Sequence, residues 1–139
     1  MATEMYANGA DIIFHAAGQA GVGVFDAARN LLIEDPDREI WVIGADVDQT
    51  AEGEFTIEDR DYSITLTSTL KRVNNVIQEF TQQTYEGNFS AGMIEYGMEE
   101  EAVDISAGQL SGETYDIVAD YREQLQNDTL NIDDLINIP

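Results

Sequence analysis

Apolar residues in the first 45 positions follow the order of a strand, a helix and a second strand. Residues 10–17 (ADIIFHAA) are almost continuously apolar, as a strand buried on both faces requires. The next stretch places apolar side chains at helical spacing and ends at Asp35-Pro36, where the proline disfavours helix at the residue before it. Residues 39–45 (EIWVIGA) form a second buried-strand pattern. These segments predict a βαβ unit with parallel strands and a right-handed crossover, and therefore an α/β protein.

The chain after residue 61 is expected to supply a third strand and the longest helix. Residues 62–67 (YSITLT) alternate and are rich in β-branched side chains, which is typical of a strand. The following apolar residues lie near one helical face. We therefore expect a helix that begins at Thr67 or Ser68, either of which can cap it, and ends near Gly87.

The remaining segments carry weaker patterns. Residues 48–61 are polar and are expected to form a connection. Residues 91–96 (AGMIEY) are expected to form a short strand, and residues 98–106 an extended segment or turn. A last helix is expected to begin at Ser111, and the tail that follows it has too little pattern for an assignment.

Three glycines follow the first predicted strand and open the helix after it. In an open parallel sheet, ligands bind beyond the carboxyl ends of the strands, and Gly18, Gly21 and Gly23 (GQAGVG) fall there. Their order is not the dinucleotide motif G-x-G-x-x-G, which argues against a nicotinamide or flavin site. Glycines at this place allow close backbone approach and expose N–H groups to a polar ligand. The alternative is a tight turn with close packing.

Asp46 and Asp48 follow the second predicted strand, in GADVDQ. Two acidic residues spaced i, i+2 point the same way in an extended chain, where they could coordinate a metal or accept hydrogen bonds from hydroxyl groups. In a chain with so many acidic residues, an arbitrary Asp belongs to the solvated surface. Asp46 differs because it ends a buried strand, where a free carboxylate needs a partner.

Lys71 is the only lysine and His15 the only histidine in the chain. We expect Lys71 in the first turn of the long helix, where a cation opposes the helix dipole. A specific polar partner at the sheet edge that carries Asp46 would explain its presence, and chance survival is the alternative. His15 lies inside the first predicted strand and is expected to be a hydrogen-bonded structural residue.

Catalytic and cofactor motifs are missing from the sequence. It contains no G-x-S-x-G, no H-E-x-x-H and no P-loop, and no serine or cysteine motif accompanies the histidine. We therefore expect no catalytic residue, no metal and no cofactor, and an enzyme is the least favoured function.

The charge of the chain excludes two classes of partner. Its 139 residues include 28 Asp and Glu against 6 Lys and Arg, giving a formal net charge of -22. Nucleic acids and anionic membranes attract basic surfaces, so we expect neither as a partner. Acidic residues are spread along the whole length, and molar salt shortens the Debye length to roughly 3 Å, which screens their repulsion. This pattern favours a salt-loving organism over a specific cation-binding role. The absence of cysteine excludes disulfides and thiolate chemistry.

Neither a membrane span nor a signal peptide is expected from the sequence. No apolar run reaches the roughly 18 residues of a span. The start, MATEMYANGADII, lacks the basic flank and long apolar core of a signal peptide. As written the chain is expected to be soluble, and the motifs indicate that it is part of something longer.

Four blocks of the sequence resemble one known family in their order along the chain. They are residues 9–28 (GADIIFHAAGQAGVGVFDAA), 41–49 (WVIGADVDQ), 66–77 (LTSTLKRVNNVI) and 86–98 (EGNFSAGMIEYGM). The chain is similar to the basic membrane protein family, the nucleoside-binding PnrA-like lipoproteins of ABC importers. The closing helix with its N-x-D-D-L tail also fits the end of that family.

The resemblance implies a fold and a domain organisation. It implies a three-layer αβα arrangement with a mostly parallel sheet, part of the two-lobed type I periplasmic-binding-protein fold. Residues 1–139 would be the C-terminal portion of such a protein. Residues 1–66 would belong mainly to its C-terminal lobe, and residues 67–139 would supply a hinge-crossing helix, a strand and the closing helix.

The resemblance also implies ligand-binding residues. In the family, the acid of the G-x-D-x-D-Q segment and the lysine of the T-S-x-x-K segment bind ribose hydroxyls, which here implies Asp46 and Lys71. The glycine-turn segment contributes backbone contacts, which implies Gly18 and Gly21. A carboxylate that accepts and an ammonium that donates suit the vicinal hydroxyls of a ribose.

Two functions follow as hypotheses. The first is a non-catalytic solute-binding component of an ABC importer, which binds a purine nucleoside or a similar polar ligand between two lobes and delivers it to the permease. Longer members of the family are extracytoplasmic, membrane-anchored lipoproteins. The alternative is a truncated ligand-sensing or self-associating structural derivative without a transport role. Such a derivative would form a homo-oligomer through the apolar surface that the missing lobe leaves exposed.

Overall fold

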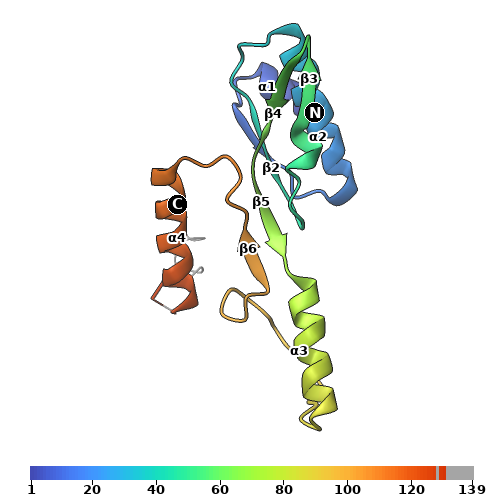
Figure 1. Cartoon of the computed structure of the whole chain (residues 1–139), viewed down its shortest axis with the longest axis vertical. Helices are drawn as coiled ribbons and strands as arrows, with labels where there is room; N and C mark the ends of the chain where they lie inside the picture. The colour runs from blue at the N-terminus through green and yellow to red at the C-terminus, as the bar shows by residue number, and fades with distance from the viewer. Residues whose placement is uncertain (128, 131–139) are drawn as a thin grey trace. The chain divides into compact units, whose positions relative to one another are not determined.

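The computed structural model describes residues 1–127 and 129–130 (Figure 1). The chain divides into two compact units. Residues 1–70 and 105–110 form the first, called here the sheet unit. Residues 71–104 and the described residues after 110 form the second, called here the helical unit.

The predicted βαβ unit is present in the sheet unit. Strand β1 (Ile12–Phe14) pairs in parallel with β2 (Trp41–Gly44), and Ile13 lies opposite Val42. Strand β5 (Thr65–Lys71) pairs in parallel with β2 on its other side. With β6 (Val103–Ile105) the strands form a sheet in the order β1-β2-β5-β6. The α/β class and the mostly parallel sheet are therefore confirmed.

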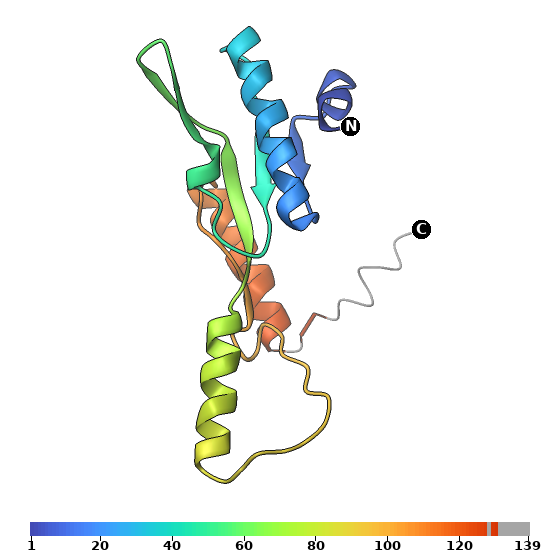
Figure 2. The same cartoon turned by 90° about the vertical axis from the view of Figure 1, so that its right-hand side faces the viewer.

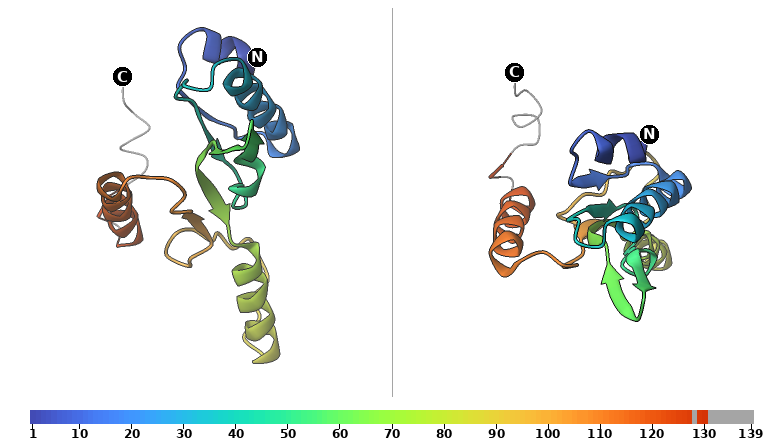
Figure 3. Two further views of the ribbon diagram at one scale, coloured as in Figure 1. Left: turned by 45° about the horizontal axis from the view of Figure 1, so that its top comes forward. Right: turned by 90° about the horizontal axis from the view of Figure 1, so that it is seen from above.

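One face of β1 and β2 packs against helices α1 (Ala2–Ala7) and α2 (Val22–Glu34) (Figures 2 and 3). The sequence pattern predicted α2 but not the short α1. The fully buried Tyr6 of α1 donates its hydroxyl to the carbonyl oxygen of Trp41 at 3.0 Å, which ties the helix to β2. The buried core comprises Tyr6, Ile13, Phe25, Ala28, Leu32, Ile40, Val42 and Ile64.

The expectation that the first strand is buried on both faces is wrong for the described structure. Ile13 is buried, but Ile12 and Phe14 on the opposite face are 48% and 51% exposed. The paired residues Trp41 and Ile43 of β2 share that face and are half-buried. The continuous apolar run therefore arises because both faces of β1 are apolar, although only one of them is covered by the described part of the sheet unit.

The polar connection contains a β-hairpin that the sequence pattern did not reveal. After a short 3-10 helix, η2 (Ala51–Gly53), strands β3 (Glu54–Ile57) and β4 (Arg60–Ser63) pair antiparallel. The two turn residues, Glu58 and Asp59, have φ of 48° and 65°. A two-residue turn with positive φ at both positions is the hairpin turn that strand twist favours, and it usually carries Asn-Gly.

Strand β5 continues further than expected, which corrects the start of the long helix. The expected helix start at Thr67 or Ser68 is wrong, because both residues lie in β5 and α3 spans Val73–Tyr85. β-branched Thr65, Thr67 and Thr69 favour the strand. Gly87 does follow the helix, with φ of 78° and its N–H donated to Thr84. At 13 residues α3 is shorter than the 15-residue α4 (Gly112–Gln126), so it is not the longest helix.

Two further expectations in the second half have different outcomes. Residues 91–96 contain no strand, so that prediction is wrong; β6 lies instead in the segment expected to be extended. Helix α4 begins as predicted, with the Ser111 side chain accepting a hydrogen bond from the Thr114 N–H at 3.2 Å. The N-x-D-D-L tail lies outside the described residues.

In the helical unit one carboxylate pairs with two arginines. Asp104, whose side chain is 9% exposed, pairs with Arg72 at 2.6 Å and with Arg122 of α4 at 3.3 Å. No residue of α3 or α4 is buried. Within the described ranges, neither these nor any other helix combines the length and apolar character needed to cross a bilayer.

Candidate functional site

The glycine turn follows β1 as a 3-10 helix, η1 (Gly18–Gly21), that leads directly into α2. Gly18 has φ of 50°, a conformation that L-residues rarely adopt, and no described atom lies within 4 Å of where its Cβ would stand. The positive φ therefore explains the glycine at this turn. Its role as a ligand contact stays a prediction.

Gly21 is buried, and close packing explains its lack of a side chain. A Cβ at this position would stand 2.1 Å from Nδ1 of His15, far inside contact distance. The expected backbone contact of Gly21 with a ligand stays a prediction, because packing alone accounts for the residue. Gly23 differs, since no described atom lies within 4 Å of its Cβ position.

His15 is 4% exposed and meets the Phe25 ring edge-on at a centroid distance of 5.6 Å. Neither ring nitrogen has a hydrogen-bond partner among residues 1–127 and 129–130. His15 is therefore a buried residue, but the expectation that its ring is hydrogen-bonded is wrong for the described residues. An apolar pocket of about 370 Å³ lies beside it, lined in part by Met5, Phe14 and Ala17.

Asp46 occupies a sharp turn directly after β2. It has φ of 72°, and the Val47 N–H donates to the carbonyl oxygen of Ala45 at 2.9 Å, which closes a three-residue turn around it. The segment is therefore not extended, and the argument that an i, i+2 pair of carboxylates points the same way does not apply here. Asp46 is half-buried. Because β1 and β2 are parallel neighbours, its loop and the glycine turn leave the same edge of the sheet.

Asp48 is engaged locally. Its Oδ1 accepts hydrogen bonds from the N–H of Thr50 at 3.0 Å and from the Thr50 hydroxyl at 2.7 Å. The residue is exposed, and this pattern is an ordinary side-chain turn. Within the described ranges no group of acidic or histidine side chains is arranged to hold a metal ion.

Lys71 is the last residue of β5 rather than part of the first turn of α3, which corrects its expected position. The argument that this cation opposes the helix dipole assumed a place in the first helical turn. It no longer applies as stated, because Lys71 precedes the first helical residue by two positions. Lys71 is exposed and belongs to the helical unit, whereas Asp46 belongs to the sheet unit. Their joint contact with one ligand stays a prediction.

Sequence reasoning missed the buried polar residues behind the Asp46 loop. Gln49 is 8% exposed, and Thr65 and Ser68 of β5 are fully buried. The Gln49 side-chain oxygen accepts from the Ala45 N–H at 2.9 Å, and the backbone N–H of Gln49 donates to Oγ of Ser68 at 3.1 Å. The available signal was a glutamine that follows the acidic residues Asp46 and Asp48 in the loop after β2. In a polar segment of this kind, the sequence alone does not distinguish a buried glutamine from one on the surface.

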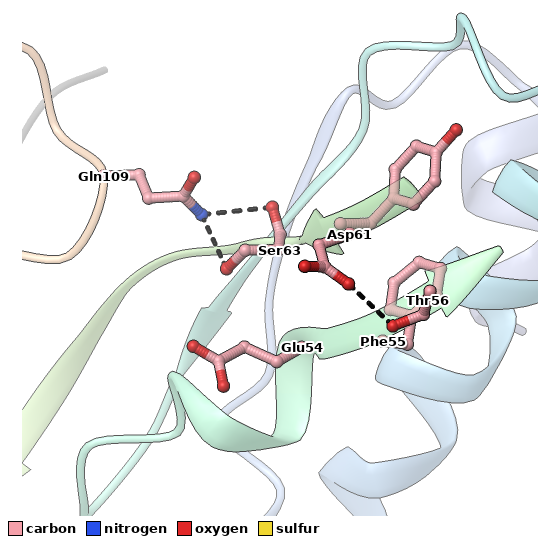
Figure 4. A pocket seen from close by; sticks show the side chains of 7 residues that line it. Glu54, Phe55, Thr56, Asp61, Ser63 and Gln109 are labelled. Atoms are coloured by element: carbon pink, nitrogen blue, oxygen red, sulfur yellow. Dashed lines mark hydrogen bonds between the residues drawn. The ribbon is translucent and has the colours of Figure 1, made fainter. Parts of the chain in front are cut away.

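A larger pocket lies beside the hairpin, with a volume of about 640 Å³. Figure 4 shows Gln109 donating to Ser63, and Thr56 to Asp61, around it. Gln109 also donates to the carbonyl oxygen of Thr65, the first residue of β5. This pocket therefore lies at the amino end of β5, opposite the edge where parallel sheets bind ligands.

The fold and its loops define a class of protein. A parallel βαβ sheet that carries a glycine turn and an acidic loop at the carboxyl ends of neighbouring strands is an α/β lobe suited to a small polar ligand. A model of the family described as "ABC transporter substrate-binding protein PnrA-like" matches residues 1–139. The chain belongs to this Bmp family of ABC transporter substrate-binding proteins, which are not enzymes.

Named relatives agree with the family. The chain is 41% identical over 136 residues to a "CD4+ T-cell-stimulating antigen" of Listeria innocua, covering 95% of this chain and 38% of that protein. It is 31% identical over 142 residues to the "ABC transporter nucleoside-binding protein BmpA" of Lactococcus lactis, covering 100% of this chain and 39% of that protein. The chain thus spans about two-fifths of the length of these relatives.

Solved structures agree with the fold. A solute-binding protein of an ABC transporter system from Aeropyrum pernix matches with a TM-score of 0.68 at 17% identity, over 94% of this chain and 42% of that one. A structure named as a transcriptional activator of the comK gene from Bacillus halodurans matches with a TM-score of 0.69 at 20% identity, over 87% of this chain and 38% of that one. Both likenesses concern the fold alone.

Proposed function

We propose that this chain forms part of the binding cleft of an extracytoplasmic substrate-binding protein that captures a purine nucleoside for an ABC importer. The observation that carries the proposal is the turn at Asp46, a half-buried acidic residue at the carboxyl edge of the sheet. The nucleoside-binding name of the Lactococcus lactis relative supports the choice of ligand class.

The chemistry of the ligand matches the residues assigned to it. Each ribose hydroxyl can donate one hydrogen bond and accept others, so a carboxylate such as Asp46 accepts a hydrogen bond from the hydroxyl and an ammonium such as Lys71 donates one to its oxygen. Hydrogen bonds with charged partners contribute about 1.5–3 kcal/mol each. Gly18 would add a backbone N–H at the neighbouring strand end.

The domain assignment is part of the same proposal. Residues 1–66 would belong mainly to the C-terminal lobe of a two-lobed protein, and residues 67–139 would supply the hinge-crossing helix, strand and closing helix. The whole protein would be held at the membrane surface by a lipid anchor, and its partner there would be the permease, as the family resemblance implies.

Isothermal titration calorimetry in molar salt tests the assignment of Asp46. Adenosine, guanosine and inosine are titrated into the wild-type chain and into Asp46→Asn, which keeps the shape and left-handed preference of the residue but removes its charge. Asp48→Asn is the matched control, because it makes the same charge change two residues away on a carboxylate engaged with Thr50.

The expected results separate the two carboxylates. Asp46→Asn should weaken binding by about tenfold or more, the equivalent of one charged hydrogen bond, while Asp48→Asn should leave it within about twofold. Equal affinity in Asp46→Asn and the wild type would remove Asp46 from the site. No heat with any of the three nucleosides at millimolar concentration would show that this chain alone does not bind them.

Lys71 is tested in the same titration. Lys71→Gln should lose affinity by a similar factor, and Arg60→Gln, which removes an exposed cation from β4 of the hairpin, should not. Equal losses in the two variants would indicate a general effect of net charge rather than a contact by Lys71.

A further inference from the structure

The loop after β2 holds a conformation that most residues avoid. Asp46 combines φ of 72° with the hydrogen bond from the Val47 N–H to the Ala45 carbonyl oxygen. A γ-turn with positive φ at its central residue is rare and strained. Such a conformation persists only where surrounding contacts over-determine it, so the question is which residues hold this turn.

Gln49 contacts the loop at the residue before Asp46. Its Oε1 accepts a hydrogen bond from the Ala45 N–H at 2.9 Å, which fixes the entry into the turn. The side chain is 8% exposed, so water competes little for this bond. Without the glutamine, the Ala45 N–H would lack its partner and the turn would lose its entry point.

Strand β5 holds Gln49 in turn. Oγ of the fully buried Ser68 accepts from the Gln49 N–H at 3.1 Å, and the Thr65 hydroxyl donates to the Gln49 carbonyl oxygen at 2.8 Å. The side-chain oxygen, the N–H and the carbonyl of Gln49 are thus all engaged. A satisfied buried network of this kind fixes the geometry of the groups attached to it.

The end of β2 packs closely against this network. A Cβ on Gly44 would stand 2.6 Å from Oγ of Ser68 and 2.9 Å from Oε1 of Gln49. Gly44 therefore lies in direct contact with both groups, and Ser68 is its partner in the sheet register. The loop is therefore held both at Gly44, where β2 ends, and at Gln49, which β5 holds.

We propose that Gln49 and Ser68 are positioning residues, which hold the loop so that Asp46 presents its carboxylate at the carboxyl edge of the sheet. The role of the carboxylate rests on the proposed function, whereas the holding of the turn does not. Gln49 and Ser68 act through Asp46 and need no contact with the ligand themselves.

The test uses Gln49→Ala and Ser68→Ala in the full chain, with Gln109→Ala as control. Gln109 lies in the same unit and donates to Ser63 and Thr65 at the other end of β5, so its loss also removes several hydrogen bonds. Nuclear magnetic resonance follows the strong intraresidue HN–Hα contact that positive φ gives Asp46, together with the amide exchange rate of Val47. Calorimetry with inosine follows affinity.

The two kinds of readout separate positioning from stability. Gln49→Ala and Ser68→Ala should each lose the positive-φ signature, raise Val47 exchange about tenfold and weaken inosine binding about tenfold. Gln109→Ala should lower the unfolding midpoint but leave all three unchanged. Gln49→Glu keeps an acceptor for the Ala45 N–H and should retain the signature.

Each contrary outcome has a distinct meaning. A positive-φ signature that survives in both Gln49→Ala and Ser68→Ala overturns the proposal. Equal loss of affinity in Gln109→Ala overturns it too, because the effect would then be general destabilisation. A wild-type chain that binds no inosine contradicts the proposed function, and the resonance data still decide whether the two residues hold the turn.

Discussion

Gly21→Ala isolates the close packing between the glycine turn and His15. The added Cβ would stand 2.1, 2.3 and 2.7 Å from Nδ1, Cε1 and Cγ of the imidazole. The ring is 4% exposed and packed against Phe25, so the new methyl group would have to displace a buried side chain. Overpacking of a buried site costs about 1–3 kcal/mol, and we expect Gly21→Ala to lower the free energy of unfolding by that amount.

Two other glycines of the same segment serve as controls. Gly23 is the second residue of α2, and apart from its chain neighbours and its own helix backbone no described atom lies within 4 Å of its Cβ position. Gly23→Ala should therefore stabilise the chain by at most about 0.5–1 kcal/mol through helix propensity. Gly18→Ala meets no described atom either, but its φ of 50° makes it cost about 1–2 kcal/mol through backbone strain alone.

Urea unfolding in molar salt, followed by Trp41 fluorescence and far-ultraviolet circular dichroism, measures all three variants. The double variant His15→Ala with Gly21→Ala tests whether the clash with the imidazole causes the loss of stability, because removing the ring makes room for the new methyl group. The cost of Gly21→Ala should therefore fall sharply in the His15→Ala background. An unchanged cost there, or a Gly21→Ala variant as stable as the wild type, would refute the packing explanation.

Three further predictions concern pH, an ion-pair cluster and salt. Burial raises the pKa of Tyr6 from 10.0 to about 12, with Arg38 lowering it in part. The neutral phenol therefore contributes stability that is complete below pH 10 and is lost as the pH rises to about 12. Urea midpoints across this range should fall less in Tyr6→Phe than in the wild type, and parallel curves would contradict the assignment. Asp104→Asn leaves Arg72 and Arg122 without their shared carboxylate, and should cost about 1–3 kcal/mol and speed amide exchange in α4; unchanged exchange would show that the cluster does not hold the helix. Because 28 acidic residues face 6 basic ones, thermal midpoints should rise steeply from dilute buffer to molar salt, and a flat dependence would argue against self-repulsion.

Self-association is a prediction that the same chain can settle. Ile12 and Phe14 of the sheet and Ile77 of α3 are 48%, 51% and 59% exposed. Sedimentation in molar salt, where charge repulsion is screened, should detect a dimer if these surfaces pair. A monomer at all concentrations would remove the self-associating alternative.

The sequence predicted the βαβ unit because two near-continuous apolar runs flank a helical pattern that ends at Asp35-Pro36. It did not predict the hairpin, because its turn residues Glu58 and Asp59 take positive φ without a glycine to mark them. Such a turn is held by contacts across the strands, where Phe55 stacks on Tyr62 at 5.5 Å.

The boundary between β5 and α3 was misplaced for a related reason. Thr67 and Ser68 serve equally well as helix caps and as strand residues, and only pairing with β2 decides between them. Beyond Ser68 the strand continues to Lys71 with β6 as its other neighbour in the sheet, which moves Lys71 from helix to strand end. Likewise, the importance of Gln49 depends on hydrogen bonds to Ala45 and Ser68, which no local pattern encodes.

The most direct test of the central claim varies the ligand rather than the protein. Calorimetry in molar salt compares inosine with 2′,3′-dideoxyinosine, which has the same base and 5′-hydroxyl but lacks the two vicinal hydroxyls at the 2′ and 3′ positions. If Asp46 and Lys71 bind those hydroxyls, the dideoxy ligand should bind at least about 100-fold more weakly, the equivalent of two charged hydrogen bonds. Equal affinity for the two ligands would contradict the account.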